Sequence, residues 1–143
     1  MRIAVKKLVP DAQLPKYAKE GDAGADICSI EDITLWSGEY KAISTGIAIE
    51  PELFCEVQCR SRSGLAAKNG VAVLNSPGTI DFGYRGELKV ILINHGKEPF
   101  RVENGMRIAQ LVVNPLCQAE FYEVSELNDS ERSGLGFGST GTK

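Results

Sequence analysis

The chain has 143 residues, enough for one domain with a sizeable core and too few for two ordinary ones. It carries 16 basic and 19 acidic residues and is 43% hydrophobic, which excludes a disordered chain and a general nucleic-acid-binding surface. No apolar run approaches the ~20 residues of a membrane span, and the first residues lack the apolar segment of a signal peptide. We therefore expect a cytoplasmic protein without nucleic-acid or membrane partners.

Short strands separated by glycine-rich turns dominate the sequence. Residues 42–50 alternate, with Ile43, Thr45, Ile47 and Ile49 on one face, which predicts a half-buried strand. The segment 90–93 is apolar on both faces, as expected for a strand covered on both sides. Further strands are predicted over 71–75, 87–94, 106–113 and 118–124, and single helical turns near 65–68 and 125–127. This pattern indicates an all-β barrel or sandwich.

The four cysteines are predicted to be free thiols. Cys55 and Cys59 alternate with polar neighbours, which places both on the apolar face of a strand. A chain of this length needs no disulfides to form a core, so buried free thiols are favoured over a redox or metal site. With a single histidine and no paired cysteine spacing of the zinc type, structural zinc is not expected.

Residues 60–66, RSRSGLA, form the first candidate site. Two guanidinium groups, two hydroxyls and a glycine suit a phosphate, because arginine offers a planar fork and glycine lets backbone N–H groups approach an oxyanion. The alternative is a solvated turn with a serine cap, and this segment alone favours that alternative.

The connection over 75–86, NSPGTIDFGYRG, is the second candidate site. A loop of this length between two strands is more often functional than a simple reversal. Its exposed backbone would read the edge of a nucleobase, with Asp81 as a general base and Tyr84 as a packing wall. The alternative is turn building, with Asp81 as an Asx-type turn residue.

Polar residues on two other segments need an explanation. Asp22 and Asp26 flank Gly24, and such carboxylates can hold the water ligands of Mg²⁺, although these residues alone favour a plain turn. Gln110 shares a strand face with apolar neighbours and needs a partner, either backbone or ligand. Arg107 is expected on the opposite face of that strand.

The last segment, 128–143, is rich in glycine and has no strand pattern. A frayed terminus would explain this composition. The alternative is an arm that closes over a ligand, in which Arg132 binds phosphate and Phe137 covers a ring. Composition does not decide between the two.

Five segments resemble, in order, the five motifs of the trimeric dUTPase family: DAGADI, RSRSGLAAKNGV, NSPGTIDFGYRGELKV, RIAQLVV and RSGLGFGSTG. They span positions from about 22 to 141, with spacings that also match. The resemblance implies a jelly-roll β-barrel over 1–127 and a flexible arm over 128–143 that closes over the active site. It also implies a homotrimer with exchange of these arms, for which the sequence gives no independent support.

The implied activity is hydrolysis of dUTP to dUMP and pyrophosphate with Mg²⁺, which limits uracil incorporation into DNA and supplies dUMP for thymidylate synthesis. By this resemblance Asp81 activates the water that attacks the α-phosphorus. Asp26 acts on Mg²⁺ through water, the metal being held mainly by the substrate phosphates. The implied substrate-binding residues of the barrel are Arg62, Ser63, Gly64, Asn75, Gly78, Thr79, Ile80, Tyr84, Lys89 and Gln110. Those of the arm are Arg132, Phe137, Gly138, Ser139 and Thr140.

The sequence departs from the family pattern at four positions. Gly83 stands where many members have a second acid, and Ser61 replaces a common proline, which would loosen that turn. In the arm, Ser133 and Leu135 occupy positions that are usually glycine. We expect the arm to close with altered kinetics, because a β-carbon at Leu135 limits the backbone.

Two other functions are compatible with this barrel. A bifunctional dCTP deaminase–dUTPase uses a glutamate in this loop region, where Glu87 lies, but such chains are usually longer and lack the arm motif. A non-catalytic nucleotide-binding module would be expected to lack Asp81, which is present here.

Overall fold

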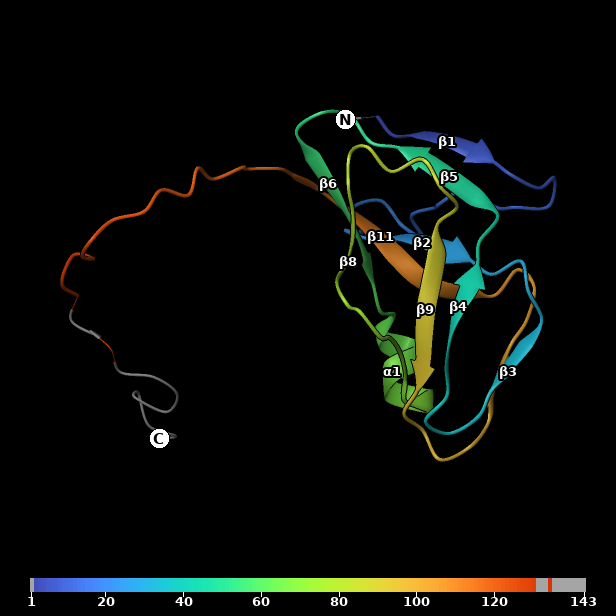
Figure 1. The fold of residues 1–143 in the computed structure, drawn as a ribbon. Coiled ribbons are helices and arrows are strands. Elements are labelled where there is room, and N and C mark those ends of the chain that lie inside the picture. Colours follow the sequence, from blue (N-terminus) through green and yellow to red (C-terminus); the bar gives the residue numbers. More distant parts are fainter. Residues whose placement is uncertain (1, 131–133, 135–143) are drawn as a thin grey trace.

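The computed structural model describes residues 2–130 and Gly134, and these residues form a mostly β domain (Figure 1). The one helix in this part of the chain is α1 (Ser63–Asn69). The strands are β1 (Ala4–Lys7), β2 (Ala25–Cys28), β3 (Ile33–Leu35), β4 (Tyr40–Ser44), β5 (Ile47–Glu50), β6 (Cys55–Arg60), β7 (Val71–Val73), β8 (Gly78–Ile80), β9 (Lys89–Asn94), β10 (Phe100–Val102) and β11 (Arg107–Pro115). The mostly β architecture predicted from the alternation is confirmed.

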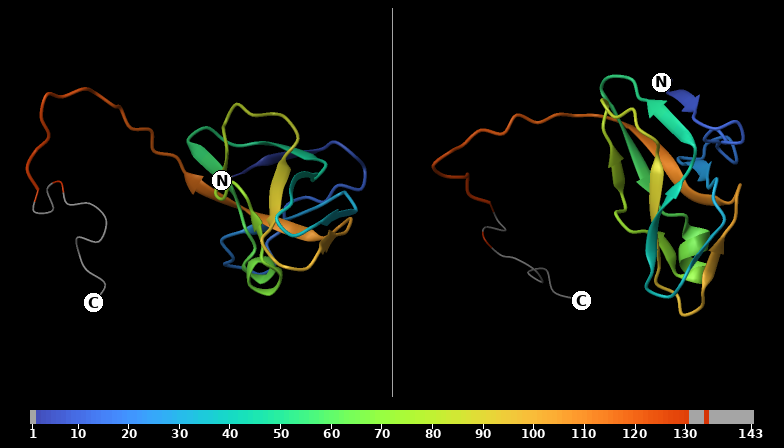
Figure 2. Two further views of the ribbon diagram at one scale, coloured as in Figure 1. Left: turned by 60° about the horizontal axis from the view of Figure 1, so that its bottom comes forward. Right: turned by 45° about the vertical axis from the view of Figure 1, so that its right-hand side comes forward.

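Two larger sheets enclose the core, and two strand pairs complete the domain. The strand orders are β2-β11-β6-β8 and β4-β9-β7, with the pairs β1-β5 and β10-β3, and every pairing is antiparallel. Figure 2 shows the two larger sheets from other sides, with β9 lying across β11. Inward side chains of both sheets form one apolar cluster, including Ile27, Ile43, Val57, Val90, Leu92 and Leu111. Burial of this cluster is the main term that stabilises the fold.

The predicted strand over 42–50 is interrupted. Ile43, Thr45, Ile47 and Ile49 are all buried, as the alternation predicts. However, the chain turns between β4 and β5 at Gly46, which has φ +67°. Glycine is the residue that adopts this left-handed conformation without strain. One strand therefore becomes two, which belong to different sheets.

The strand predicted over 118–124 is not formed, and neither is the helical turn at 125–127. After β11 the chain runs away from the barrel as an extended segment (Figures 1 and 2). Along it Phe121 is 95% exposed and Leu127 is 88% exposed. The alternation is suited to a strand, but a strand needs a neighbour to satisfy its backbone, and residues 2–117 place none beside this segment.

Other predictions from the sequence are confirmed with small shifts. The helical turn at 65–68 extends to the whole of α1, and the strands over 71–75, 87–94 and 106–113 are present as β7, β9 and β11. The strand at 90–93 is covered on one side within the chain, because Val90 and Leu92 are buried whereas Ile91 and Ile93 are half-buried. Within the described residues, no helix is long and apolar enough to cross a membrane.

All four cysteines are free thiols, as predicted, and Cys117 is exposed while the other three are buried. Cys55 and Cys59 lie on the inward face of β6. Burial raises the pKa of the Cys59 thiol to about 11, because an apolar environment disfavours the thiolate. Burial also raises the pKa of Cys28, with a smaller contribution from the nearby Asp26 carboxylate. Neither thiol is activated for nucleophilic chemistry.

Candidate active site

A cavity of about 450 Å³ opens beneath the connection between β8 and β9. Its floor is apolar and is formed by core residues including Ile27, Cys59 and Leu111. Its rim contains seven of the residues singled out from the sequence, namely Asn75, Gly78, Thr79, Ile80, Asp81, Tyr84 and Lys89. A mostly apolar cavity with a few polar groups at its rim is typical of a small-molecule site. We call it the hairpin cavity.

Backbone and side-chain bonds fix the base of the connection to the turn between β4 and β5. The Gly46 N–H donates to Glu87 Oε1 at 3.0 Å, and the Leu88 N–H donates to the Ile47 carbonyl at 2.8 Å. The buried Thr45 hydroxyl donates to the Leu88 carbonyl at 2.5 Å. The break at Gly46 therefore supplies the groups that hold the wall of the cavity.

Asp81 and Tyr84 are joined by a tight turn. The Tyr84 N–H donates to the Asp81 carbonyl at 3.0 Å, and the Tyr84 hydroxyl donates to the Glu87 carbonyl at 2.8 Å. This second bond directs the tyrosine ring along the loop. Within residues 2–130, no hydrogen bond or ion pair engages the exposed Asp81 carboxylate, so the alternative of an Asx-type turn is not formed there. The carboxylate faces the hairpin cavity and is accessible to a ligand.

A second cavity, of about 290 Å³, contains the other five barrel residues selected from the sequence. They are Asp26, Arg62, Ser63, Gly64 and Gln110. Arg62 is the residue before α1, and Ser63 and Gly64 begin the helix. No side chain caps this helix, so the predicted serine cap is wrong. We call this space the arginine cavity.

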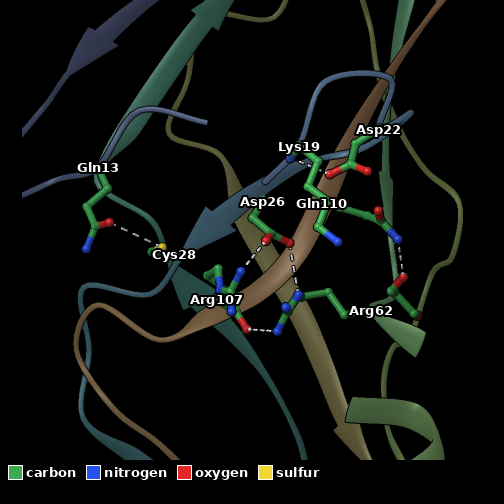
Figure 3. Close-up of polar contacts among 9 residues, drawn as sticks. Gln13, Lys19, Asp22, Asp26, Cys28, Arg62, Arg107 and Gln110 are labelled. Carbon is green, nitrogen blue, oxygen red and sulfur yellow. Dashed lines mark hydrogen bonds and ion pairs between the residues drawn. The ribbon is translucent and has the colours of Figure 1, made fainter. Parts of the chain in front are cut away.

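Asp26 is the electrostatic centre of the arginine cavity (Figure 3). Its Oδ1 accepts from Arg62 Nε at 2.9 Å, and its Oδ2 accepts from Arg107 Nη1 at 3.0 Å. Arg62 Nη1 also donates to the Arg107 carbonyl at 3.0 Å. The side chain of Asp26 is 16% exposed and meets two guanidinium groups. Asp22 also lines the cavity, so the side-chain charges balance. Any affinity for an anion would come from the remaining N–H donors of Arg62, not from a net positive charge.

Gln110 finds its partner in the backbone, because its Nε2 donates to the Ser61 carbonyl at 2.9 Å. The Ser61 hydroxyl in turn accepts from the Val73 N–H at 2.8 Å. Ser61 therefore ties this turn to two neighbouring strands, through its carbonyl and its hydroxyl. The side chain of Gln110 also fills the space that a β-carbon on Gly24 would need.

Arg107 was not among the residues selected from the sequence, and its predicted orientation is wrong. It was expected on the face opposite Gln110, but the register of β11 on β2 shifts between Arg107 and Ala109. This bulge brings Arg107 to Asp26, which is the register partner of Gln110. A bulge depends on pairing with a strand far away in the sequence, so strand alternation could not predict it. The one available signal was that Arg107 belongs to the segment RIAQLVV, which resembles a family motif.

A metal would find few ligands in the protein itself. Among the described residues, no group of three or more His, Cys, Asp or Glu side chains could hold an ion. Both Asp26 oxygens already accept from arginines, although each carboxylate oxygen has a second lone pair. This donor set fits Mg²⁺ that is bound mainly through substrate phosphates and water, and it does not fit an all-protein site.

The two cavities lie on opposite faces of the sheet β2-β11-β6-β8. Asp26, Gln110 and Arg60 are register partners across three strands, and their side chains share one face. Cys59 and Leu111 are also register partners, one residue further along, and line the hairpin cavity on the other face. The predicted arm residues Arg132, Phe137, Gly138, Ser139 and Thr140 lie outside the described residues.

Comparison with known proteins identifies the family. A family model for dUTPase matches residues 10–141. Deoxyuridine 5'-triphosphate nucleotidohydrolases from Clostridioides difficile and Nautilia profundicola are 58% and 54% identical, covering 97% and 99% of each chain respectively. The structure of the Staphylococcus bacteriophage 80alpha dUTPase with dUpNHpp is similar, with a TM-score of 0.90 at 30% identity over 98% of each chain. A mutant dUTPase of phage phi11, whose structure describes a structural Mg(II) ion, has a TM-score of 0.83 at 25% identity, covering 90% of this chain and all of that one. The chain therefore belongs to the dUTPase family.

Proposed function

We propose that this protein hydrolyses dUTP to dUMP and pyrophosphate, with Asp81 as the residue that activates the attacking water. The observation that carries the proposal is the hairpin cavity, in which an exposed carboxylate stands at the rim of a nucleoside-sized apolar space. The chain is a dUTP nucleotidohydrolase by its similarity to relatives of that name over its full length. The residue roles below are our assignments.

The nucleoside would enter the hairpin cavity. Uracil would pair with Asn75 and with the backbone of β8, whose strand geometry presents fixed N–H and C=O groups. A slot of this kind rejects cytosine, because mismatched buried donors and acceptors are left unpaired, which can discriminate by ~10⁴ or more. Tyr84 would pack beneath the deoxyribose and leave no room for a 2′-hydroxyl, and Lys89 would continue the substrate-binding strand.

The triphosphate would be bound by the arginine cavity. Arg62 supplies a fork for phosphate oxygens, and Ser63, Gly64 and Gln110 add donors around it. Bound Mg²⁺ would neutralise charge that develops on the phosphates during pyrophosphate departure. Asp26 holds Arg62 in place and would accept hydrogen bonds from water on the metal through its remaining lone pairs. Asp81 would orient a water in line with the α-phosphorus and accept its proton.

A ligand that touches both cavities needs two copies of the chain, because one sheet separates them. We therefore propose a homotrimer in which the hairpin cavity of one subunit faces the arginine cavity of another. The outward face of β4-β9-β7 supports such contacts. Its register partners are apolar, with Tyr40, Ile93 and Ala72 in one row and Ala42 and Ile91 in the next. In such an assembly β9, which is apolar on both faces over 90–93, would be covered on both sides.

The C-terminal part of the chain would complete the site by exchange between subunits. Residues 116–127 extend away from their own barrel and carry exposed apolar side chains, which is typical of a segment that packs on a partner. We assign 1–127 to the barrel domain and 128–143 to an arm that closes over the site. Arg132 would clamp the γ-phosphate, Phe137 would stack on uracil, and Gly138, Ser139 and Thr140 would wrap the phosphates.

The test is release of pyrophosphate from dUTP, dCTP, dTTP and UTP with Mg²⁺, using wild type and Asp81→Asn. We expect release from dUTP alone, with loss of activity in the variant. Ammonia and dUMP from dCTP would show the bifunctional deaminase instead. The Glu87 carboxylate, which would be the candidate glutamate of a deaminase, accepts from the Gly46 N–H and lies 3.6 Å from Lys89 Nζ. Binding of dUTP without release would show a non-catalytic module.

A further inference from the structure

Arg85 ties together the turn that carries Asp81 and Tyr84. Its Nη1 donates to the carbonyl oxygen of Phe82 at 2.5 Å and to that of Tyr84 at 3.0 Å. The guanidinium carbon also lies 5.7 Å from the centroid of the Phe82 ring, within the range of a cation–π contact. One planar group thus binds two carbonyls of the loop and contacts one of its rings.

The same guanidinium joins the loop to the barrel. Arg85 Nη2 forms an ion pair with Glu50 Oε1 at 2.9 Å. Glu50 is the last residue of β5, and its backbone is in register with Ala4 of β1. Figure 1 shows the connection between β8 and β9 passing beside the end of β5. The loop tip is therefore attached to a part of the barrel that is itself held by strand pairing.

In the described part of the chain, no other polar contact attaches this tip to the rest of the domain. Within residues 2–130, the remaining bonds of 81–86 are the Tyr84 N–H to Asp81 and the Tyr84 hydroxyl to Glu87, both internal to the connection. Glu87 and Leu88 hold the base of the connection at the turn between β4 and β5. Arg85 lines neither the hairpin cavity nor the arginine cavity, so it does not reach a ligand there.

We infer that Arg85, together with Glu50, is a positioning residue that sets the Asp81 carboxylate and the Tyr84 ring for the reaction. This inference rests on the proposed function, in which Asp81 directs a water and Tyr84 excludes a 2′-hydroxyl. Displacement of a catalytic group by about 1 Å can cost a reaction on the order of a hundredfold. The fork of arginine matters here, because one terminal nitrogen binds both carbonyls while the other binds the carboxylate, whereas a lysine offers all its donors from one nitrogen.

The test compares Arg85→Gln, Arg85→Lys and Glu50→Gln with Arg101→Gln. Arg101 is a matched control, because it is exposed, pairs with Glu103 at 3.7 Å and lines neither cavity. The measurements are kcat and KM for dUTP, the ratio of kcat/KM for dUTP over UTP, and the thermal unfolding midpoint. A purely structural role would lower the amount of folded enzyme without changing the nucleotide ratio.

We expect Arg85→Gln to lower kcat for dUTP by on the order of tenfold to a hundredfold and to lower the dUTP/UTP ratio by at least about tenfold. Arg85→Lys should restore little of either, because it keeps the charge and loses the fork. Glu50→Gln should have a smaller effect of the same kind, because both carbonyl bonds remain. Arg101→Gln should behave as wild type.

Two results would overturn the inference while leaving the proposed function intact. One is an Arg85→Gln enzyme with the wild-type nucleotide ratio and kcat. The other is an equal loss for dUTP and UTP. If Arg85→Gln does not fold, Glu50→Gln decides, and a wild-type ratio in that variant counts against the inference. Failure of the wild type to hydrolyse dUTP would instead overturn the proposed function itself.

Discussion

Gln110 and Leu111 are consecutive residues of β11, yet they line different cavities on opposite faces of one sheet. Gln110 faces the cluster of Asp26 and Arg62, and Leu111 forms part of the floor beneath Asp81. A strand places successive side chains on alternate faces, so a single chain cannot bring both sets to one small ligand. This separation is the physical basis for the homotrimer that we propose, in which two subunits share each site.

Hydrolysis in water enriched in ¹⁸O shows which phosphorus atom of dUTP the water attacks. If Asp81 directs water to the α-phosphorus, the label appears in dUMP and pyrophosphate remains unlabelled. Asp81→Asn should slow the reaction by on the order of 10²–10⁴, because it removes the general base. Mass spectrometry of both products gives the answer, and label in pyrophosphate would show attack at the β-phosphorus.

Replacement of Gly46 by alanine should destabilise the protein by about 1–3 kcal/mol. The residue has φ +67°, and an added β-carbon would lie 2.8 Å from Val9 Cγ2. Gly83→Ala is the matched control, because a β-carbon there meets nothing within 4 Å and its φ is not positive. Urea unfolding of both variants measures the difference. Equal stabilities for the two variants would show that the turn between β4 and β5 does not require glycine.

The raised pKa of the Cys59 thiol predicts that the protein loses stability at high pH. Burial raises its pKa from 9.0 to about 11, so the folded state retains the proton more tightly than the unfolded state does. Stability is therefore fully present below the unfolded pKa and is lost as the pH rises through the folded value. A shift of about two pH units corresponds to about 3 kcal/mol at most.

Urea unfolding between pH 8 and pH 11 tests this dependence in Cys59→Ala and Cys117→Ala. The first variant removes the buried thiol, so its stability should fall less steeply over this range. The second removes an exposed thiol and should follow the wild type. Parallel curves for all three proteins would show that ionisation of Cys59 does not contribute.

The residues around the hairpin cavity could be chosen from the sequence because their chemistry is local. Glycine, asparagine and aspartate in a long loop between strands mark a functional connection, and the structure places all seven selected residues of this region around one cavity. The contribution of Arg107 could not be predicted, because the bulge that turns it toward Asp26 arises from pairing with β2. Strand alternation alone assigns it to the wrong face.

The segment 118–124 shows the opposite limitation. Its alternation predicts a strand, and the structure forms none there, because the neighbour that a strand requires is absent from the described part of its own chain. Pattern determines which face of a strand is apolar, and it does not say which chain supplies the partner. Gly46 is a similar case, since the alternation continues through it while the backbone changes direction.

Mixing two inactive variants tests the shared site most directly. Asp81→Asn removes the base from the hairpin cavity, and Arg62→Gln removes the phosphate fork from the arginine cavity. When the two chains are co-expressed with different tags and purified as mixed trimers, about a third of the sites should join an intact Asp81 to an intact Arg62 of another subunit, because one of the three interfaces in each mixed ring has that order. We predict that dUTP hydrolysis returns to about that fraction of wild type. A mixture no more active than either variant alone would contradict the account.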